Sequence, residues 1–121
     1  MRIMYFIFFV AILFSCNDAE SDEIQTVTKK EMQQLLKQDN IQLIDVRTVS
    51  EYKRGYISRA QNIDFMSENF EINIQKLDKT RPVIVYCQRG GRSAKCAKKM
   101  KALGFIKIYD LEGGYSKWEV E

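Results

Sequence analysis

The stretch PVIVYCQRGGRS, residues 82–93, decides the fold, because it joins an uninterrupted apolar run to a loop of glycines and arginines. The apolar run Val83 to Tyr86 predicts a strand that is buried on both faces of a sheet. The one proline of the chain, Pro82, stands at the first position, where its missing N–H disturbs a strand least. Ligands of parallel sheets bind beyond the carboxyl ends of the strands, so Cys87 stands where a reactive group is expected.

Outward from this strand, apolar runs alternate with helical patterns. Two capping boxes, Thr28 to Glu31 and Thr48 to Glu51, predict helix starts. A glycine at Gly104 predicts the end of a helix. We expect strands at 41–46, 82–87 and 106–111, brief extended pieces near 56–65, and helices at 28–39, 48–55, 67–78, 93–103 and after 113. Strands separated by helices predict an α/β fold with a parallel sheet between two helical layers.

The length of 121 residues suits a single domain, and the net charge of +3 is small. The chain has three cysteines and no histidine, which excludes Cys/His zinc patterns and any catalytic pair with an imidazole base. It has no basic arm and no nucleic-acid-binding motif. We therefore expect no metal, no cofactor and no nucleic-acid partner. We also expect a monomer, although composition does not decide the oligomeric state.

The first sixteen residues, MRIMYFIFFVAILFSC, read as a targeting segment. The apolar run from Ile3 to Ser15 is short for a membrane span and suits the core of a secretory signal. Its end, LFSC at 13–16, resembles a bacterial lipoprotein box, although Phe14 is bulkier than usual. That resemblance implies cleavage before Cys16 and lipidation of its sulfur. A plain signal peptide or a short membrane anchor is the alternative.

This assignment predicts three segments: a lipoprotein signal peptide at 1–15, an acidic flexible tether at 16–26 and a folded domain at 27–121. The acyl chains on Cys16 would anchor the protein to a membrane. We expect an exported lipoprotein of a bacterial cell envelope, on the periplasmic or surface face. The choice between inner and outer membrane stays open.

The loop after the central strand is suited to stabilise a thiolate. The start of a helix near Arg92 or Ser93 directs free N–H groups and a positive dipole end into the loop. Gly90 and Gly91 allow these N–H groups to converge on an anion. We therefore expect the pKa of Cys87 to lie below its usual value, which removes the need for a general base.

Several separated motifs resemble a single-domain rhodanese, a sulfurtransferase module, over residues 27–118. They are LIDVRTVSEYKRGYI at 43–57, AQNID at 60–64, the run 82–105, and IYDLEGG with GGYSKW at 108–118. The resemblance implies a five-stranded parallel sheet flanked by helices on both faces. It also implies a Cys87 persulfide that carries sulfur from a donor such as thiosulfate to cyanide or a thiol. The loop residues expected to hold the substrate are Gln88, Arg89, Gly90, Gly91, Arg92 and Ser93.

Other residues match the family in structural positions. Asp45 and Arg47 belong to its D-V-R motif, and we expect Arg47 to pair with a carboxylate such as Glu51. Trp118 is expected to be the apolar plug of the last helix. Two positions depart from the pattern: Tyr56 replaces a common histidine, and Arg59 replaces a common glycine, which leaves the local turn geometry open.

Alternatives accompany these assignments. The spacing from Cys87 to Arg92 is C-x4-R, whereas related cysteine phosphatases use the longer C-x5-R, so sulfur transfer is favoured over phosphoryl transfer. A non-catalytic module that carries sulfur or binds a protein is the main competing function. Arg89 and Arg92 could be ordinary surface charges, and four lysines of the following helix could steer anions or only solvate it. Cys96 fits a core stripe with Met100 and Leu103, with a redox role as the minority alternative.

Overall fold

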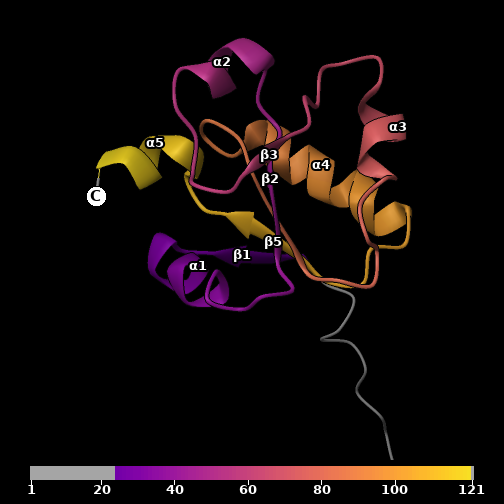
Figure 1. Ribbon diagram of the computed structural model, residues 1–121, viewed down its shortest axis with the longest axis horizontal. Coiled ribbons are helices and arrows are strands. Elements are labelled where there is room, and N and C mark those ends of the chain that lie inside the picture. The colour runs from indigo at the N-terminus through magenta and orange to yellow at the C-terminus, as the bar shows by residue number, and fades with distance from the viewer. Residues whose placement is uncertain (1–23, 121) are drawn as a thin grey trace, which may run out of the picture.

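A five-stranded parallel sheet runs through the centre of the molecule, with the strand order β1-β5-β4-β2-β3 (Figure 1). The computed structural model describes residues 24–120. The strands are β1 (Gln25–Val27), β2 (Gln42–Asp45), β3 (Gln61–Asn62), β4 (Val83–Tyr86) and β5 (Ile108–Leu111). Every neighbouring pair is parallel, and β4 lies in the middle. The predicted five-stranded parallel sheet is confirmed.

The central strand β4 is buried on both faces of the sheet, which explains its uninterrupted apolar sequence. Val83 and Val85 belong to one hydrophobic core. Ile84 and Tyr86, which alternate with them, belong to the other. Side chains of a strand point alternately to opposite faces, so each core takes two residues of β4.

Helices cover both faces of this sheet (Figure 1). They are α1 (Lys29–Leu35), α2 (Val49–Lys53), α3 (Phe70–Ile74), α4 (Gly91–Ala102) and α5 (Gly114–Val120). Phe70 of α3 and Met100 of α4 are buried in the core that holds Val83. Met32 of α1 is buried in the other core, and Trp118 of α5 packs against it. The prediction of helical layers on both faces is confirmed.

The predicted helix boundaries hold where the sequence carries a specific cap. Thr28 and Thr48 are both N-caps, and each forms a complete capping box with the glutamate three residues later. Helix α4 ends at Ala102 with Leu103 as its C-cap, and Gly104 follows this C-cap with a φ of 95°. Many helices end with a residue in the left-handed conformation at this position, and glycine adopts that conformation without strain.

Several predicted boundaries need correction. The first helix, predicted to end at residue 39, ends at Leu35, and the strand predicted from residue 106 begins at Ile108. Gln25 and Thr26, which we assigned to the tether, are the first two residues of β1 and pair with β5. Helix α4 begins at Gly91 instead of Ser93. Helix α3 is only five residues long, because its N-cap Asn69 makes no side-chain hydrogen bond and turns flank it on both sides. The predicted signal peptide, Cys16 and most of the tether lie outside the described residues.

The departure at Arg59 now has a geometry. Arg59 is the one non-glycine residue of 24–120 with a positive φ, at 73°. This left-handed conformation favours glycine, which is the common residue at this position in the family that the sequence resembles. The Arg59 side chain also forms a hydrogen bond, since its Nη2 donates to the carbonyl oxygen of Leu36 at 3.0 Å.

No helix within residues 24–120 is long and apolar enough to cross a membrane.

Candidate active site

The loop after β4 wraps around the sulfur of Cys87. The N–H of Gly90 donates to Cys87 Sγ at 3.0 Å, and Ser93 Oγ lies 3.5 Å from the same sulfur. Gly90 is the N-cap of α4 and has a φ of 122°, which a side chain would disfavour. Gly91 has no such φ, so only one of the two glycines is needed for the turn. The helix start and the turn together direct N–H groups at the sulfur, as the sequence predicts.

This surrounding lowers the pKa of Cys87 below its usual value. Burial alone would raise the pKa, because it penalises the charged form. Hydrogen bonds from the Ser93 hydroxyl and from the N–H groups of Ser93, Gly90 and Arg89 outweigh that effect. Burial instead raises the pKa of Cys96 to about 12. The two cysteines within residues 24–120 therefore differ in chemistry, and of these two only Cys87 is prepared to act as a thiolate.

Cys87 is buried, and it is among the residues that line a pocket of about 330 Å³. Its lining consists of residues of the loop, the first turn of α4 and one residue of α2: Cys87, Gln88, Arg89, Gly91, Arg92 and Glu51. A second pocket of about 370 Å³ shares Glu51 and Gln88 with it. The exposed Arg89 is one of the residues lining the first pocket, and its backbone N–H contributes to lowering the pKa of Cys87.

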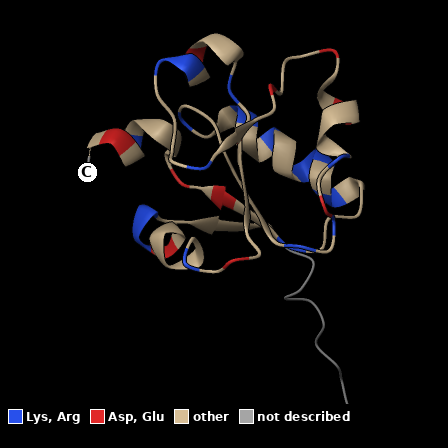
Figure 2. Cartoon of the chain, viewed as in Figure 1, with Lys and Arg blue, Asp and Glu red and all other residues tan. Residues whose placement is uncertain are grey.

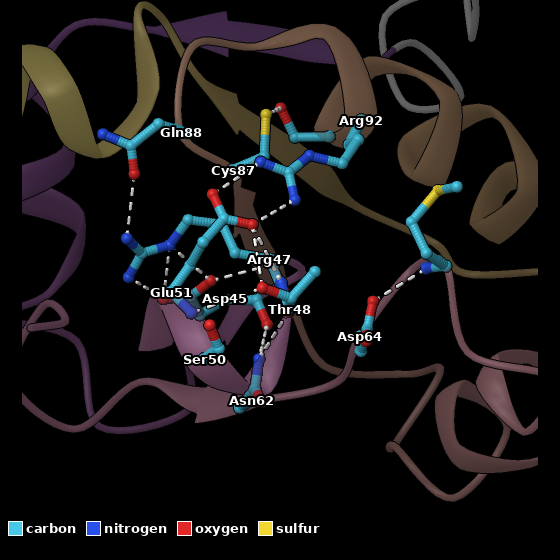
Figure 3. A network of polar contacts seen from close by, with 12 residues as sticks. Asp45, Arg47, Thr48, Ser50, Glu51, Asn62, Asp64, Cys87, Gln88 and Arg92 are labelled. Carbon is cyan, nitrogen blue, oxygen red and sulfur yellow. Dashed lines mark hydrogen bonds and ion pairs between the residues drawn. The ribbon is translucent and has the colours of Figure 1, made fainter. Parts of the chain in front are cut away.

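Arg92 was predicted to hold the substrate, and its guanidinium forms an ion pair with Glu51 of α2. Nη1 lies 2.6 Å from Glu51 Oε1, and Nη2 lies 2.9 Å from Oε2 (Figure 3). We expected Arg47 to pair with a carboxylate such as Glu51; Arg47 does pair with a carboxylate, but it is Asp45, and Glu51 pairs with Arg92. The hydrogen bond to Glu51 raises the pKa of Arg92, with a smaller contribution from the charge of Cys87, and both Arg92 and Cys87 line the same pocket. Glu51 thus holds one positive group at the pocket.

We predict that this ion pair makes stability depend on pH below about 4.5. The hydrogen bond from Arg92 lowers the pKa of Glu51 from 4.5 to about 2, so the folded state binds fewer protons there than the unfolded state. The contribution is complete above pH 4.5 and is lost as the pH falls to about 2. Glu51→Gln keeps the capping geometry. Between pH 4.5 and 2 this variant should lose about 1 kcal/mol less free energy of unfolding in urea than the wild type.

The matched control for this prediction is Glu71→Gln. This variant removes an exposed and longer ion pair, in which Glu71 Oε1 lies 4.0 Å from Lys99 Nζ. That variant should keep the slope of the wild-type protein between pH 4.5 and 2. Equal slopes for Glu51→Gln and the wild type would contradict the assignment of Glu51 to the low-pH loss.

The partner of Arg47 is Asp45, and both side chains are almost fully buried. Arg47 Nη2 lies 2.6 Å from Asp45 Oδ2 and 2.7 Å from the carbonyl oxygen of Gly55. Its Nη1 donates to Gln88 Oε1 at 2.9 Å. The Gln88 side chain is therefore tied to the end of β2, and the predicted structural role of Asp45 and Arg47 has a geometric basis (Figure 3).

Helix α5 holds the loop from the other side, a contact that sequence reasoning missed. The N–H of Tyr115 donates to the carbonyl oxygen of Cys87 at 2.9 Å, and that of Ser116 to the carbonyl oxygen of Gln88 at 3.0 Å. Gly114 allows this approach, because a Cβ there would lie 2.4 Å from the Cys87 oxygen. The pair of glycines at 113–114 was the available signal. Trp118 is half-buried on the neighbouring core, so it is a partial plug.

We predict that Gly114→Ala destabilises the fold and displaces the Cys87 loop. The φ of 59° at Gly114 costs an L-residue about 1–2 kcal/mol, and the contact with the Cys87 oxygen adds to that cost. Urea unfolding measures the loss. Gly91→Ala is the control, because its Cβ meets nothing within 4 Å, and it should change stability by less than about 0.5 kcal/mol. Equal stabilities of the two variants would contradict the close approach.

Basic residues follow the outer side of α4 (Figure 2). Lys95, Lys98 and Lys101 are exposed, and Lys99 pairs loosely with Glu71. Among the described residues, no group of three or more His, Cys, Asp or Glu side chains could hold a metal ion.

Comparisons with known proteins agree with this geometry. The family model described as "Rhodanese-like domain" matches residues 28–121. YqhL of Bacillus subtilis, an uncharacterized protein, is 40% identical over 77 residues, which are 64% of this chain. The chain spans 60% of the length of that relative.

Two further proteins carry sulfurtransferase names. Thiosulfate sulfurtransferase GlpE of Shewanella oneidensis is 32% identical over 85 residues, 70% of this chain and 82% of GlpE. The solved structure of the human single-domain sulfurtransferase TSTD1 has a TM-score of 0.68 at 26% identity, with 82% of this chain and 99% of that chain covered. With most of its length matched by the family model, this chain belongs to the rhodanese-like domain family.

Proposed function

We propose that this protein is a sulfurtransferase that carries a sulfane sulfur atom as a persulfide on Cys87. The observation that carries the proposal is the sulfur of Cys87, which accepts hydrogen bonds from the loop and belongs to a residue that lines a pocket. Its lowered pKa supplies a thiolate nucleophile without a general base, and the sequence contains no histidine.

The reaction has two steps. In the first, the Cys87 thiolate attacks the outer sulfur of thiosulfate, a bond forms between the two sulfur atoms, and the sulfur–sulfur bond of the donor breaks to release sulfite. In the second, cyanide or a thiolate attacks the outer sulfur of the persulfide and regenerates the Cys87 thiolate. The N–H groups around Sγ are placed to stabilise the negative charge that each step leaves in the loop.

The test is the intact mass of the chain from residue 17 onward, before and after thiosulfate. The expected result is a gain of one sulfur atom, which disappears when cyanide is added and thiocyanate is formed. No gain on a protein with a free Cys87 thiol would overturn thiosulfate as the donor. It would favour a non-catalytic module that binds a protein or is loaded by one.

An assay for hydrolysis of a phosphate ester distinguishes a sulfurtransferase from the phosphatase-like alternative. The loop from Cys87 to Arg92 spans six residues, one fewer than the C-x5-R ring of cysteine phosphatases, and Arg92 is already paired with Glu51. We expect no release of phosphate from an aryl phosphate.

We further propose that the protein is exported and attached to a bacterial envelope membrane through a lipidated Cys16. The support is the apolar run at 3–15 and the LFSC box that ends it. Labelling cells with a radioactive fatty acid should mark the wild-type protein and leave Cys16→Ser unlabelled. Label on both proteins, or on neither, would overturn the anchor.

A further inference from the structure

A second pocket lies next to the Cys87 pocket, and the proposed reaction does not yet use it. Its volume is about 370 Å³, which is in the range of pockets that bind small molecules. Every residue of its lining carries a polar or charged side chain: Arg47, Glu51, Arg54, Gln88, Tyr115 and Glu119. Glu51 and Gln88 also line the Cys87 pocket, so the two pockets share a wall. A molecule in the second pocket is therefore held beside the loop that carries the reactive sulfur.

The wall between the two pockets is fixed by contacts within the chain. The N–H of Tyr115 donates to the carbonyl oxygen of Cys87 at 2.9 Å. Arg47 Nη1 donates to Gln88 Oε1 at 2.9 Å, and Arg47 Cζ lies 4.3 Å from the centroid of the Tyr115 ring. Because a guanidinium can only donate, the amide oxygen of Gln88 faces Arg47 and the amide nitrogen points away (Figure 3). The chain thus holds this pocket in shape, and such preorganisation favours binding of a ligand.

Four charged side chains line the second pocket, and two of them are neutralised by partners in the chain. Arg47 pairs with Asp45, whose Oδ2 lies 2.6 Å from Arg47 Nη2. Glu51 pairs with Arg92, and both carboxylate oxygens of Glu51 accept hydrogen bonds from the guanidinium. The charges available to a ligand therefore come from the two remaining side chains.

These two side chains are Arg54 and Glu119, one basic and one acidic. Arg54 is the C-cap of α2 and Glu119 belongs to α5, so two elements distant in sequence bring them to one pocket. Both are exposed, and within residues 24–120 neither takes part in an ion pair. Arg54 Nη2 has only a long contact, at 3.5 Å from Ser50 Oγ. The pocket thus offers a guanidinium to a carboxylate and a carboxylate to an ammonium group.

We propose that the second pocket binds the sulfur acceptor, and that this acceptor is a small thiol carrying both a carboxylate and an ammonium group. Arg54 binds the carboxylate and Glu119 binds the ammonium group. The thiol is then free to reach the persulfide of Cys87 past Gln88. This site rests on the proposed function, because it names the acceptor of that same reaction.

Sulfur transfer to such an acceptor is balanced without a further reactant. The acceptor thiol loses its proton to water, and the resulting thiolate attacks the outer sulfur of the persulfide. A sulfur–sulfur bond forms in the acceptor, which becomes a persulfide. The bond from the outer sulfur to Cys87 Sγ breaks, and its electron pair stays on Cys87 as the thiolate.

The experiment measures how fast three small thiols remove sulfur from the Cys87 persulfide, on the full chain in mild detergent. The protein is loaded with thiosulfate, freed of excess donor and followed by intact mass after each thiol is added. Free cysteine carries both charged groups, cysteamine lacks the carboxylate, and 3-mercaptopropionate lacks the ammonium group. Arg54→Gln should lower the ratio of the cysteine rate to the cysteamine rate by about threefold, the effect of one exposed ion pair. Glu119→Gln should lower the ratio of the cysteine rate to the 3-mercaptopropionate rate by a similar factor.

The use of ratios separates binding of the acceptor from a structural role, because a damaged fold would slow transfer to all three thiols. Lys53→Gln and Glu112→Gln are matched controls, since they remove the same charges from exposed side chains that do not line this pocket. Both controls should keep the wild-type ratios. Wild-type ratios in Arg54→Gln and Glu119→Gln would overturn the acceptor site.

A binding measurement separates failure of this site from failure of the proposed function. S-methylcysteine keeps both charged groups but has no thiol, so it can bind without taking sulfur. At millimolar concentration it should shift the backbone amide NMR signals of Tyr115 and Ser116, and each of the two pocket variants should weaken its binding by about threefold. Absence of these shifts would overturn the site.

The two measurements together assign any failure to one of the two proposals. If S-methylcysteine binds as expected and thiosulfate loads no sulfur on Cys87, the proposed function fails while the pocket keeps its ligand. If sulfur is loaded and the ratios do not change in the variants, the acceptor site fails while the proposed function stands.

Discussion

Cys87→Ser should abolish sulfur uptake, with a loss of at least about a thousandfold in the rate of sulfite release from thiosulfate. A hydroxyl in the same place stays protonated, because the loop that lowers the pKa of a thiol is far too weak to ionise an alcohol. The fold should tolerate the change, since serine is close in size and Ser93 and Gly90 offer it hydrogen-bond partners. Sulfite release with purified protein measures the loss.

The matched control is Cys96→Ala, which removes the other cysteine of the described chain. Cys96 is fully buried in the core and its pKa is raised to about 12, so it supplies no thiolate near neutral pH. This variant should lose some stability and keep the sulfite release of the wild type. Uptake that survives Cys87→Ser, or disappears in folded Cys96→Ala, would move the persulfide away from Cys87.

The fold could be predicted wherever a local signal is sufficient by itself. A capping box satisfies its own N–H groups, so Thr28 and Thr48 begin helices regardless of what packs against them. The apolar run of β4 has no polar face, and only a central strand can bury it. The short strand β1 carries no such signal, because Gln25 and Thr26 are exposed and gain their order from pairing with β5.

The same distinction holds for the site. Cys87, the turn at Gly90 and the start of α4 are neighbours in sequence, so their convergence on one sulfur could be predicted. The pairing of the arginines could not, because it depends on how α2 lies over the loop. Two carboxylates and two arginines meet there, and a tertiary contact decides that Glu51 takes Arg92.

Asp45→Ala should cost about 3–5 kcal/mol of folding stability, the range for removing one partner of a buried ion pair. Arg47 would remain 2% exposed and charged, with Asp45 gone and only neutral oxygens of Gly55 and Gln88 as hydrogen-bond acceptors. Burying an uncompensated charge is far more costly than losing the attraction itself. Urea unfolding at neutral pH measures the effect. The loop should loosen as well, because Arg47 ties Gln88 to the end of β2.

The double variant Asp45→Leu with Arg47→Met distinguishes this cause from simple loss of packing. Replacing both charges with apolar groups of similar volume removes the uncompensated charge, and such replacements are often neutral or stabilising. The double variant should therefore be more stable than Asp45→Ala alone, although the carbonyl oxygen of Gly55 loses one donor. If it were equally unstable, the cost would lie in the lost hydrogen bonds to Gly55 and Gln88 and not in the unpaired charge. If the double variant recovers stability as predicted, the ion pair of Asp45 and Arg47 is not needed for the stability of the fold. Its role is then to position the loop through the hydrogen bond from Arg47 to Gln88.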